Sequence, residues 1–456
     1  MKNQPSSDRL ERFVENPRKA MWIIAAPMMA GFTVHAMYTV VDSVFIGMLG
    51  AEALAAAGYI GALFFVAIAL TSGLSTGITA CVAQAFGARD HERMSHLASN
   101  GLSLALSLAL FFTTAGVLLG PQLVGLLGAE GKSAEFAWDY MLPLWLGMPL
   151  FFFSTAIRSV INGEGDAKTP MIILAASTML NLALDPIFIF LFDWGIRGAA
   201  LATLAAHSFA LLALIYVAFI RKRITSRFLV SRMPFSAAFL RPILSIGLPA
   251  AAGQLVMAVG MILVNKLLAH FGQMAVAGYV AGNRADMIVT LPLLGIASAA
   301  MTLIAMFSGA NRPDLVKSTT LYAYRWALIF AVAFGISIFL LSDVVVKLFV
   351  KEDAAFQIGR QYLGYAVFAY PLMAMGMTSG RILQGLGYGW PSLVITTVRV
   401  VFIGAAGAYT AVYLFDGGIT SVWISFIAGG FGSLFLALFW IRKFLWKNIQ
   451  QTGKTP

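Results

Sequence analysis

The sequence predicts an all-α membrane protein built from two similar halves of six transmembrane helices each. Three observations predict it: a composition unsuited to a soluble protein, recurrent long apolar segments and an internal repeat. Of the 456 residues, 59% are hydrophobic and 11% are charged, whereas charged residues make up about 25% of a typical soluble domain. A soluble chain this poor in charge could not cover its own surface, so the sequence indicates a bilayer protein.

Twelve apolar segments are long enough to cross a membrane, which takes roughly 20 mostly apolar residues. Breaks at glycine, proline and charge clusters separate them. The fourth and tenth are the least regular, because Asp139, Arg360 and Gln361 interrupt them. The expected spans are 20–47, 53–84, 94–120, 134–157, 168–192, 197–220, 239–270, 275–307, 315–341, 355–380, 390–415 and 419–445.

Basic residues gather in alternate loops and in both terminal segments, and six of them lie between Arg221 and Arg241. Such loops usually face the cytoplasm. We therefore expect a cytoplasmic N-terminal segment (1–19), an N-lobe (20–220), a cytoplasmic linker (221–238), a C-lobe (239–445) and a cytoplasmic tail (446–456). The net charge of +11 then reflects these loops, and no nucleic-acid partner is expected.

The two halves repeat at a nearly constant offset. Pro27 pairs with Pro249 and Gly87 with Gly309, each 222 residues apart (249 − 27 and 309 − 87). The segment "INGEGDAKTP" resembles "LQGLGYGWP" at the same offset, and "LFDWGI" resembles "LFDGGI" one residue further on. Six helices per repeat make both halves enter the membrane in the same direction. Parallel repeats of this kind place substrate sites between them near the middle of the bilayer.

Two carboxylic acids lie deep in apolar segments of the first half. Asp42 is in the first segment, within "MYTVVDSVFIG", and Asp185 is in the fifth, within "NLALDPIFIF". An ionisable group inside a membrane helix costs about 2.5–3.5 kcal/mol on insertion scales, and such groups usually mark ion or substrate pathways. Two acids in a low-dielectric environment favour protonation of at least one. The alternative, that each merely pairs with a buried base, lacks a Lys or Arg in the first, fifth or sixth segment at matching depth.

Helical spacing gives these acids polar neighbours. His35, Tyr38 and Asp42 are spaced i, i+3, i+7, and so are Thr178, Asn181 and Asp185, while Thr203 and His207 are four apart in the sixth segment. Where these three faces meet, carboxylate, amide and hydroxyl oxygens would suit a proton or a hard cation such as Na⁺. His35, Tyr38 and His207 could equally be packing residues, and Thr203 could bond only to its own helix backbone.

Pro186 directly follows Asp185 and cannot donate a backbone hydrogen bond to the carbonyl of Leu182. We expect a kink and a possible hinge there, beside the acid. Pro27 could bend the first segment in the same way.

The second half does not duplicate the acids. At the offset of 222, Asp42 corresponds to Val264 and Asp185 to Gly407. This half instead carries Asn265, Lys266, Asn283, Arg284, Asp286 and Arg399 in its apolar segments. Arg284 and Asp286 could form an internal ion pair or a gate, or a network that stabilises the bundle. The asymmetry predicts that the first half couples ions and the second supplies the wall of the path.

Motifs of soluble enzymes are absent from the sequence. There is no Walker A pattern, and no Cys/His group has the spacing of a metal site. The single cysteine, Cys81, allows no intramolecular disulfide. We therefore expect neither an enzyme nor a bound cofactor other than the coupling ion.

The motifs "VVDSVFIGMLGAEALAAAG", "AQAFGARD", "NGEGDAKTP" and "NLALDPIFIF…GIRGAALAT" resemble the multidrug and toxic compound extrusion (MATE) transporters over nearly the whole chain, and look closest to the DinF-like branch. The resemblance implies a cation site of Asp42, Asn181 and Asp185, with Thr203 as a further Na⁺ ligand and Tyr38 nearby. NorM-like relatives carry acids on helices 7 and 10, where this chain has Met257 and Met373. That second site is therefore missing here.

The resemblance implies a monomeric, multi-pass transporter of the cell membrane, with both termini cytoplasmic and its two six-helix bundles forming a V around a central cavity. We expect an antiporter that exports amphipathic, often cationic organic compounds in exchange for H⁺ or Na⁺. A lipid-linked saccharide flippase of the same fold superfamily is the alternative. It would use Lys266, Arg284 and Arg399 to bind pyrophosphate. A membrane-embedded enzyme is a third hypothesis, but the sequence offers no catalytic cluster near an interface.

Overall fold

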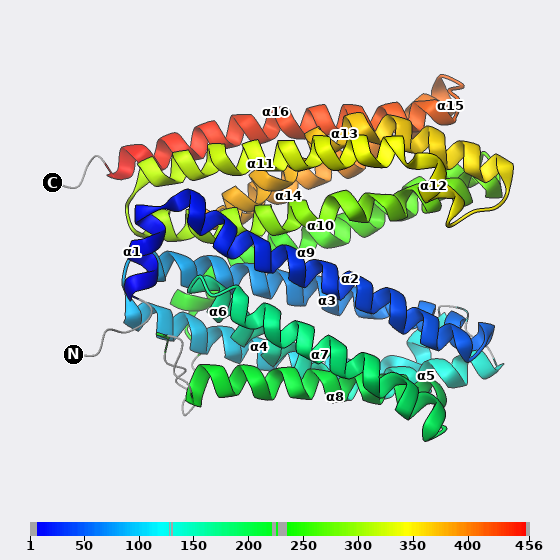
Figure 1. The fold of residues 1–456 in the computed structure, drawn as a ribbon, viewed down its shortest axis with the longest axis horizontal. Helices are drawn as coiled ribbons and strands as arrows, with labels where there is room; N and C mark the ends of the chain where they lie inside the picture. Colours follow the sequence, from blue (N-terminus) through cyan, green and yellow to red (C-terminus); the bar gives the residue numbers. More distant parts are fainter. Residues whose placement is uncertain (1–6, 127, 129–130, 221–224, 227–234, 453–456) are drawn as a thin grey trace. The chain divides into compact units, whose positions relative to one another are not determined.

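The computed structural model describes residues 7–126, 128, 131–220, 225–226 and 235–452, and every element among them is a helix (Figure 1). The chain forms two compact units. Unit 1 comprises Met1–Arg12 and Ala30–Gly247, and unit 2 comprises Phe13–Met29 and Leu248–Pro456.

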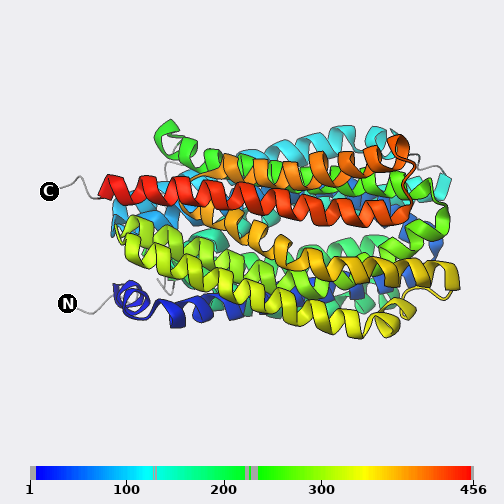
Figure 2. The same ribbon diagram turned by 90° about the horizontal axis from the view of Figure 1, so that it is seen from above.

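In unit 1 the long helices run lengthwise and alternate in direction (Figures 1 and 2). Its elements are α1 (Ser7–Glu15), α2 (Pro17–Met48), α3 (Ala51–Gly87), α4 (His91–Leu126), α5 (Gly131–Leu146), α6 (Met148–Gly163), α7 (Lys168–Pro186), η1 (Ile187–Leu191), α8 (Gly195–Ile215) and η2 (Tyr216–Ile220). The part of α1 after Arg12 and the part of α2 up to Met29 belong to unit 2.

Unit 2 repeats this plan, and its helix α13 packs against α10, α11 and α16. Its elements are α9 (Ala237–Ala269, mostly in this unit), α10 (Gln273–Gly309), α11 (Pro313–Leu340), α12 (Ser342–Lys347), α13 (Asp353–Gly385), α14 (Gly389–Thr397), η3 (Val398–Ala405), α15 (Ala406–Leu414) and α16 (Ile419–Thr452).

All twelve predicted segments coincide with helices. Ten helices of the described chain are long and apolar enough to span a membrane, and α5 with α6 forms an eleventh, bent candidate. The tenth predicted segment, 355–380, lies within α13, a 33-residue helix. Ten of the twelve predicted segments therefore correspond to single helices that could span a membrane. The other two are the fourth and the tenth, which polar residues interrupt in the sequence.

The fourth segment is not the continuous helix that we expected over 134–157. It is broken at Gly147, where α5 and α6 meet with a bend of 46°. Pro149 has no N–H for the carbonyl of Trp145, and the Thr113 hydroxyl donates to that carbonyl instead, at 2.9 Å. A neighbouring helix thus satisfies the polar group that the break exposes, as a membrane interior requires.

The internal repeat is visible in the backbone. Left-handed φ values occur at Arg89 (57°) and Asn311 (57°), and at Gly165 (81°) and Gly387 (94°). Each pair is separated by 222 residues (311 − 89 and 387 − 165). Positive φ is uncommon for residues other than glycine, so its recurrence at this offset confirms that the two halves share turns as well as helices.

The division between the units falls inside α2, a few residues after Pro27. Before it, Trp22 donates its indole N–H to the Tyr322 hydroxyl at 3.1 Å and packs edge-on against Trp326, 5.0 Å between ring centroids. These contacts with α11 explain why the start of α2 groups with unit 2, whereas we had expected an N-lobe that begins at residue 20.

Of the expected linker 221–238, the structure describes only residues 225–226 and 235–238. Glu164, fully buried after α6, accepts hydrogen bonds from the backbone N–H groups of Thr225 (2.8 Å) and Ser226 (2.9 Å). The Ser226 hydroxyl adds a third at 2.7 Å. Three donors satisfy this carboxylate and hold this part of the linker against the end of α6.

Candidate functional site

The predicted site residues of the first half all lie in unit 1, on α2, α7 and α8. The helices α7 and α8 are joined where the Ser177 hydroxyl donates to the carbonyl of Ala206 at 2.7 Å. Near their shared loop, Gly198 lies so close to the backbone of Phe188 that a Cβ there would meet its carbonyl oxygen at 2.5 Å. Gly198 thus lets the start of α8 lie directly against η1, just after Pro186.

The polar face of α7 is buried, as its spacing predicts. The exposed fraction falls from 7% for Thr178 to 2% for Asn181 and 0% for Asp185. Buried polar side chains need partners in the protein. Asn181 supplies one, because its Nδ2 donates to Oδ1 of Asp185 at 3.2 Å.

The face of α2 meets the other two helices. The Tyr38 hydroxyl lies 3.3 Å from Oγ1 of Thr203, which joins α2 to α8. Asp42 is half-buried, and its carboxyl group interacts electrostatically with that of Asp185. The structure therefore brings Tyr38, Asp42, Asp185 and Thr203 together, as the three predicted faces require.

Three oxygen atoms of this cluster are buried and accept no hydrogen bond: Oδ1 of Asp42, Oδ1 of Asn181 and Oδ2 of Asp185. All three atoms are hydrogen-bond acceptors. Leaving a buried acceptor without a donor costs roughly 1–3 kcal/mol, and more for a charged group. The cluster therefore has a local excess of acceptors, which a proton or a bound cation would relieve.

The donor set fits a hard cation, because carboxylate, amide and hydroxyl oxygens are the ligands such ions prefer. Asp42, Asn181, Asp185 and Thr203 could supply them. Within the described residues no group of three or more His, Cys, Asp or Glu side chains is arranged to hold a metal ion.

Pro186 ends the α-helical part of α7, and the π-helical turn η1 follows at once. A π turn within a membrane helix changes the register of backbone hydrogen bonds, and such turns often occur at functional sites. The backbone is therefore irregular directly beside Asp185, at the position where the proline predicts a kink.

Sequence reasoning missed two residues near this cluster, Tyr140 on α5 and Arg158 on α6. Tyr140 interacts electrostatically with Asp42 and Asp185. Arg158 interacts with His35 and His207 instead. Tyr140 lies in the expected fourth segment and Arg158 lies one residue beyond its end. Helical spacing from the acids and Thr203 cannot indicate residues on these other helices.

The second half holds its own acid, the half-buried Asp286 on α10. Its Oδ1 accepts a hydrogen bond from the Tyr370 hydroxyl at 2.6 Å, and its Oδ2 accepts from Tyr362 at 2.5 Å and from Nδ2 of Asn283 at 3.2 Å. Both oxygens are satisfied. Arg284 points elsewhere, with its guanidinium 5.8 Å from the centre of the Phe349 ring, so the ion pair considered from the sequence is not formed.

Glycines allow the tyrosines to reach Asp286. A Cβ at Gly282 would meet the Tyr362 ring at 2.5 Å, and one at Gly278 would meet the carbonyl of Ala355 on α13 at 2.5 Å. The close contact of α10 with α13 therefore depends on positions without side chains. Met257 on α9 accepts a weak contact from Arg399, Nη2 to Sδ 3.4 Å.

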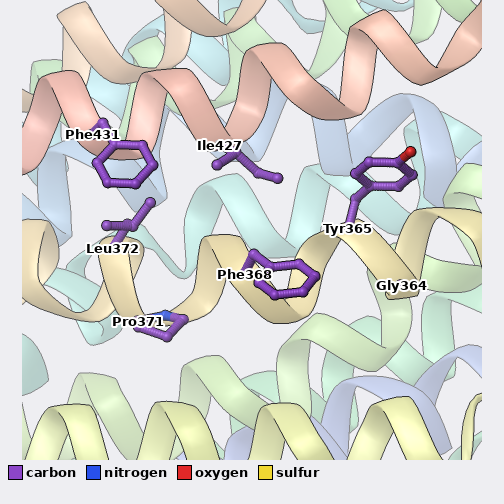
Figure 3. A pocket seen from close by; sticks show the side chains of 7 residues that line it. All are labelled: Gly364, Tyr365, Phe368, Pro371, Leu372, Ile427 and Phe431. Carbon is purple, nitrogen blue, oxygen red and sulfur yellow. The ribbon is translucent and has the colours of Figure 1, made fainter.

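A groove of about 610 Å³ lies between α13 and α16 of unit 2 (Figure 3). The side chains of Phe368, Leu372 and Phe431 face it, and Tyr365 is its one hydroxyl-bearing lining residue. Phe368 and Phe431 are 67% and 61% exposed. An exposed apolar groove on two membrane helices suits contact with lipid chains, and it lacks the acids needed to couple an ion.

The MatE family model matches the chain twice, over residues 27–187 and 249–410. The two matches begin 222 residues apart (249 − 27), which is the offset of the internal repeat. Together they cover more than half of the chain.

Among curated relatives, "Probable multidrug resistance protein NorM" of Thermotoga maritima is 26% identical over 90% of this chain and 89% of its own length. The "FAD transporter" of Shewanella oneidensis is 25% identical over 85% of this chain and 87% of its own. A solved structure described as MATE in the bent conformation matches with a TM-score of 0.93 and 28% identity, over 99% of this chain and all of that one. The chain therefore belongs to the MATE family of membrane transporters.

Proposed function

We propose that this protein is a secondary antiporter that exports amphipathic organic compounds in exchange for H⁺ or Na⁺, coupled through Asp42 and Asp185. One observation carries the proposal: three buried oxygens of Asp42, Asn181 and Asp185 accept no hydrogen bond. A fixed structural network would satisfy these atoms. A site that must take up and release an ion has to leave them available.

Ion uptake would act on the residues around the acids. A proton on Asp185 would turn one acceptor into a donor, and the free oxygen of Asn181, one helical turn away, could receive it. A Na⁺ ion would bind the free oxygens of Asp42, Asn181 and Asp185. The Thr203 hydroxyl would leave Tyr38 and become a further ligand of the ion. Either ion would neutralise the mutual repulsion of Asp42 and Asp185.

Pro27 and Pro186 are the proposed hinges. Pro27 lies just before the residue at which α2 passes from unit 2 to unit 1, and Pro186 lies between α7 and η1. Neutralising Asp42 would alter the bend of α2 beyond Pro27 and so lower the affinity for substrate. Export would alternate between outward-open and inward-open states of the two repeats.

The substrate is proposed from the family, and the names of relatives vary. The Thermotoga relative is named a multidrug resistance protein, whereas the Shewanella relative is named a FAD transporter. The chain has 21 methionines and 35 phenylalanines, and flexible methionine side chains can repack around varied apolar molecules. We therefore propose amphipathic small molecules, with organic cations among them.

We place the protein in the cell membrane as a monomer with both termini cytoplasmic. The excess of basic residues in the loops after alternate helices supports this orientation. Within unit 2, the start of α2 and the end of α16 lie at the same end of the helices (Figure 1), which agrees with termini on one side.

The two rival functions are not favoured. The family model and the named relatives are those of MATE transporters, so a flippase for lipid-linked saccharides has no support from them. The buried acids of unit 1 would also repel a pyrophosphate group. Because the relatives are transporters, the enzyme hypothesis has no support either.

The test is Asp42→Asn in proteoliposomes loaded with a fluorescent amphipathic cation such as ethidium. Wild-type protein should export the dye when a pH gradient or a Na⁺ gradient is imposed, and the effective gradient identifies the ion. The substituted amide can neither carry charge nor take up a proton, so gradient-driven export should be lost while the purified yield is unchanged. Asp314→Asn serves as the control, because Asp314 is 59% exposed beside Arg312 and surface ion pairs contribute little. Full transport by the Asp42→Asn variant would sink the mechanism.

A further inference from the structure

Arg158 lies in the last two turns of α6, one residue beyond the expected span 134–157, and its side chain is half-buried. No ion pair among the described residues involves it. The groups that feel its charge are two imidazoles, His35 on α2 and His207 on α8. A partly buried arginine that has other bases nearby and no carboxylate partner is costly unless an anion joins it.

A second observation marks the same place. Phe151, Ser154 and Arg158 are spaced i, i+3, i+7 on one face of α6. The Phe151 ring packs on His207 with 4.1 Å between centroids, so this face is turned towards α8. The Ser154 hydroxyl on it is buried, 9% exposed, and has no hydrogen-bond partner. A free hydroxyl, a guanidinium and two imidazoles all offer donors to one region.

This basic cluster (Arg158, His35, His207 and Ser154) is displaced from the acids along the helices. His35 precedes Asp42 by seven residues on α2, and His207 follows Thr203 by four on α8. The two helices run in opposite directions (Figure 1), so both displacements point the same way. Arg158 is not among the groups that perturb Asp42 or Asp185. His35 is exposed, which leaves the cluster open to a ligand.

We propose that the basic cluster is a subsite for an anionic group of the exported compound, a carboxylate or a phosphate, with Arg158 as its principal ligand. This inference rests on the proposed function, because it names a class of substrate for the same transporter. A preferred substrate then carries an apolar body and an acid, and a zwitterion can place its cationic group towards Asp42 and Asp185. Purely cationic compounds would use the acids alone.

The chemistry of the side chains supports this assignment. Arginine stays protonated at any physiological pH and binds carboxylate or phosphate oxygens through two parallel N–H groups. Neutral imidazoles and the Ser154 hydroxyl can each donate one further hydrogen bond. No titration of a histidine is needed for the subsite to bind an anion.

A matched pair of dyes tests the proposal. Rhodamine B carries a carboxylate beside its delocalised cation, and rhodamine B ethyl ester is the same dye with the carboxylate blocked. We would measure equilibrium binding of each by fluorescence anisotropy, to purified protein in phosphatidylcholine nanodiscs without any ion gradient. Wild-type protein should bind rhodamine B more tightly than the ester. Arg158→Gln should weaken binding of rhodamine B by roughly 10- to 100-fold and leave that of the ester unchanged.

Two further variants make the outcome decisive. Arg158→Lys keeps the charge but not the paired geometry, so it should retain part of the preference. Arg381→Gln is the matched control. At the repeat offset of 222, Arg158 corresponds to residue 380, one before Arg381. The Arg381 side chain donates a hydrogen bond to Gln384 at 3.4 Å. The control variant should leave the preference intact. Unchanged binding of the ester by the Arg158 variants shows that they are folded.

Equal affinity of wild-type protein for the two dyes, or an equal loss of both in Arg158→Gln, would overturn the subsite. So would loss of the preference on adding phosphatidylglycerol, since that result would assign the cluster to a lipid phosphate. Binding without a gradient does not depend on coupling. If Asp42→Asn exported normally while the carboxylate preference held, the coupling mechanism would fail and the subsite would stand.

Discussion

The acids within the helices of unit 1 and the acid within α10 of unit 2 differ in how their oxygens are satisfied. Asp42 and Asp185 each keep an oxygen that accepts no hydrogen bond. Asp286 has both oxygens occupied, by Tyr370, Tyr362 and Asn283. The two repeats therefore carry two kinds of acid. Those of unit 1 each have an oxygen still able to accept a hydrogen bond or bind an ion, whereas both oxygens of Asp286 are already occupied.

The difference shows why a count of membrane acids does not identify an ion site. A carboxylate that receives three hydrogen bonds is stabilised where it stands and gains little from a proton or a cation. A carboxylate with a free buried oxygen gains a partner when the ion arrives. We therefore expect substitution of the first kind of acid to cost stability, and substitution of the second kind to cost coupling.

The largest expected effect follows from Asp185→Asn. Asparagine keeps an oxygen that can accept from Nδ2 of Asn181, so the fold should be retained, but it can neither bind a proton nor carry charge. Coupling between two ligands of one protein is commonly worth about 5–150-fold in affinity. We expect the ion's effect on substrate affinity to disappear, measured as dye binding with and without the coupling ion. The melting temperature should change little. Retention of ion-dependent binding would show that Asp185 is not a coupling residue.

Asp286→Asn, the same chemical change in unit 2, should have the next largest effect, on stability. The new amide nitrogen cannot accept from Tyr362 or Asn283, and each buried donor left without an acceptor costs about 1–3 kcal/mol. We expect the free energy of unfolding to fall by roughly 2–4 kcal/mol, read as a lower melting temperature in detergent. Export per folded molecule should still respond to the ion gradient. Loss of that response at unchanged stability would break the comparison.

Tyr38→Phe should have the smallest effect. It removes only the hydroxyl that lies 3.3 Å from Thr203, and a neutral hydrogen bond contributes about 0.5–1.5 kcal/mol. If Na⁺ is the coupling ion, freeing Thr203 should strengthen Na⁺ binding slightly, by a few-fold at most. Isothermal titration with NaCl, compared with wild-type protein, would show it. A large loss of coupling in this variant would instead place Tyr38 among the ion ligands.

The sequence by itself determined the fold class, the positions of the apolar segments and the repeat. Long apolar segments have few ways to satisfy their backbone in a bilayer, so hydropathy alone predicts helices. The face of Thr178, Asn181 and Asp185 was predicted too, because helical periodicity fixes which residues of one segment point the same way. Even the irregular fourth and tenth segments were identified, since charged residues disturb the hydropathy that defines a span.

Only the tertiary structure decided which side chains from different helices meet. Arg158 and Tyr140 lie 27 or more residues before Asp185 in sequence, and no periodicity relates them to residues on α2, α7 or α8. The two tyrosine partners of Asp286 are likewise 76 and 84 residues away, so the occupation of both its oxygens could not be inferred. At the break at Gly147, the carbonyl of Trp145 accepts its hydrogen bond from Thr113, which lies on another helix. Packing between helices sets these distances, and a single sequence contains no direct record of it.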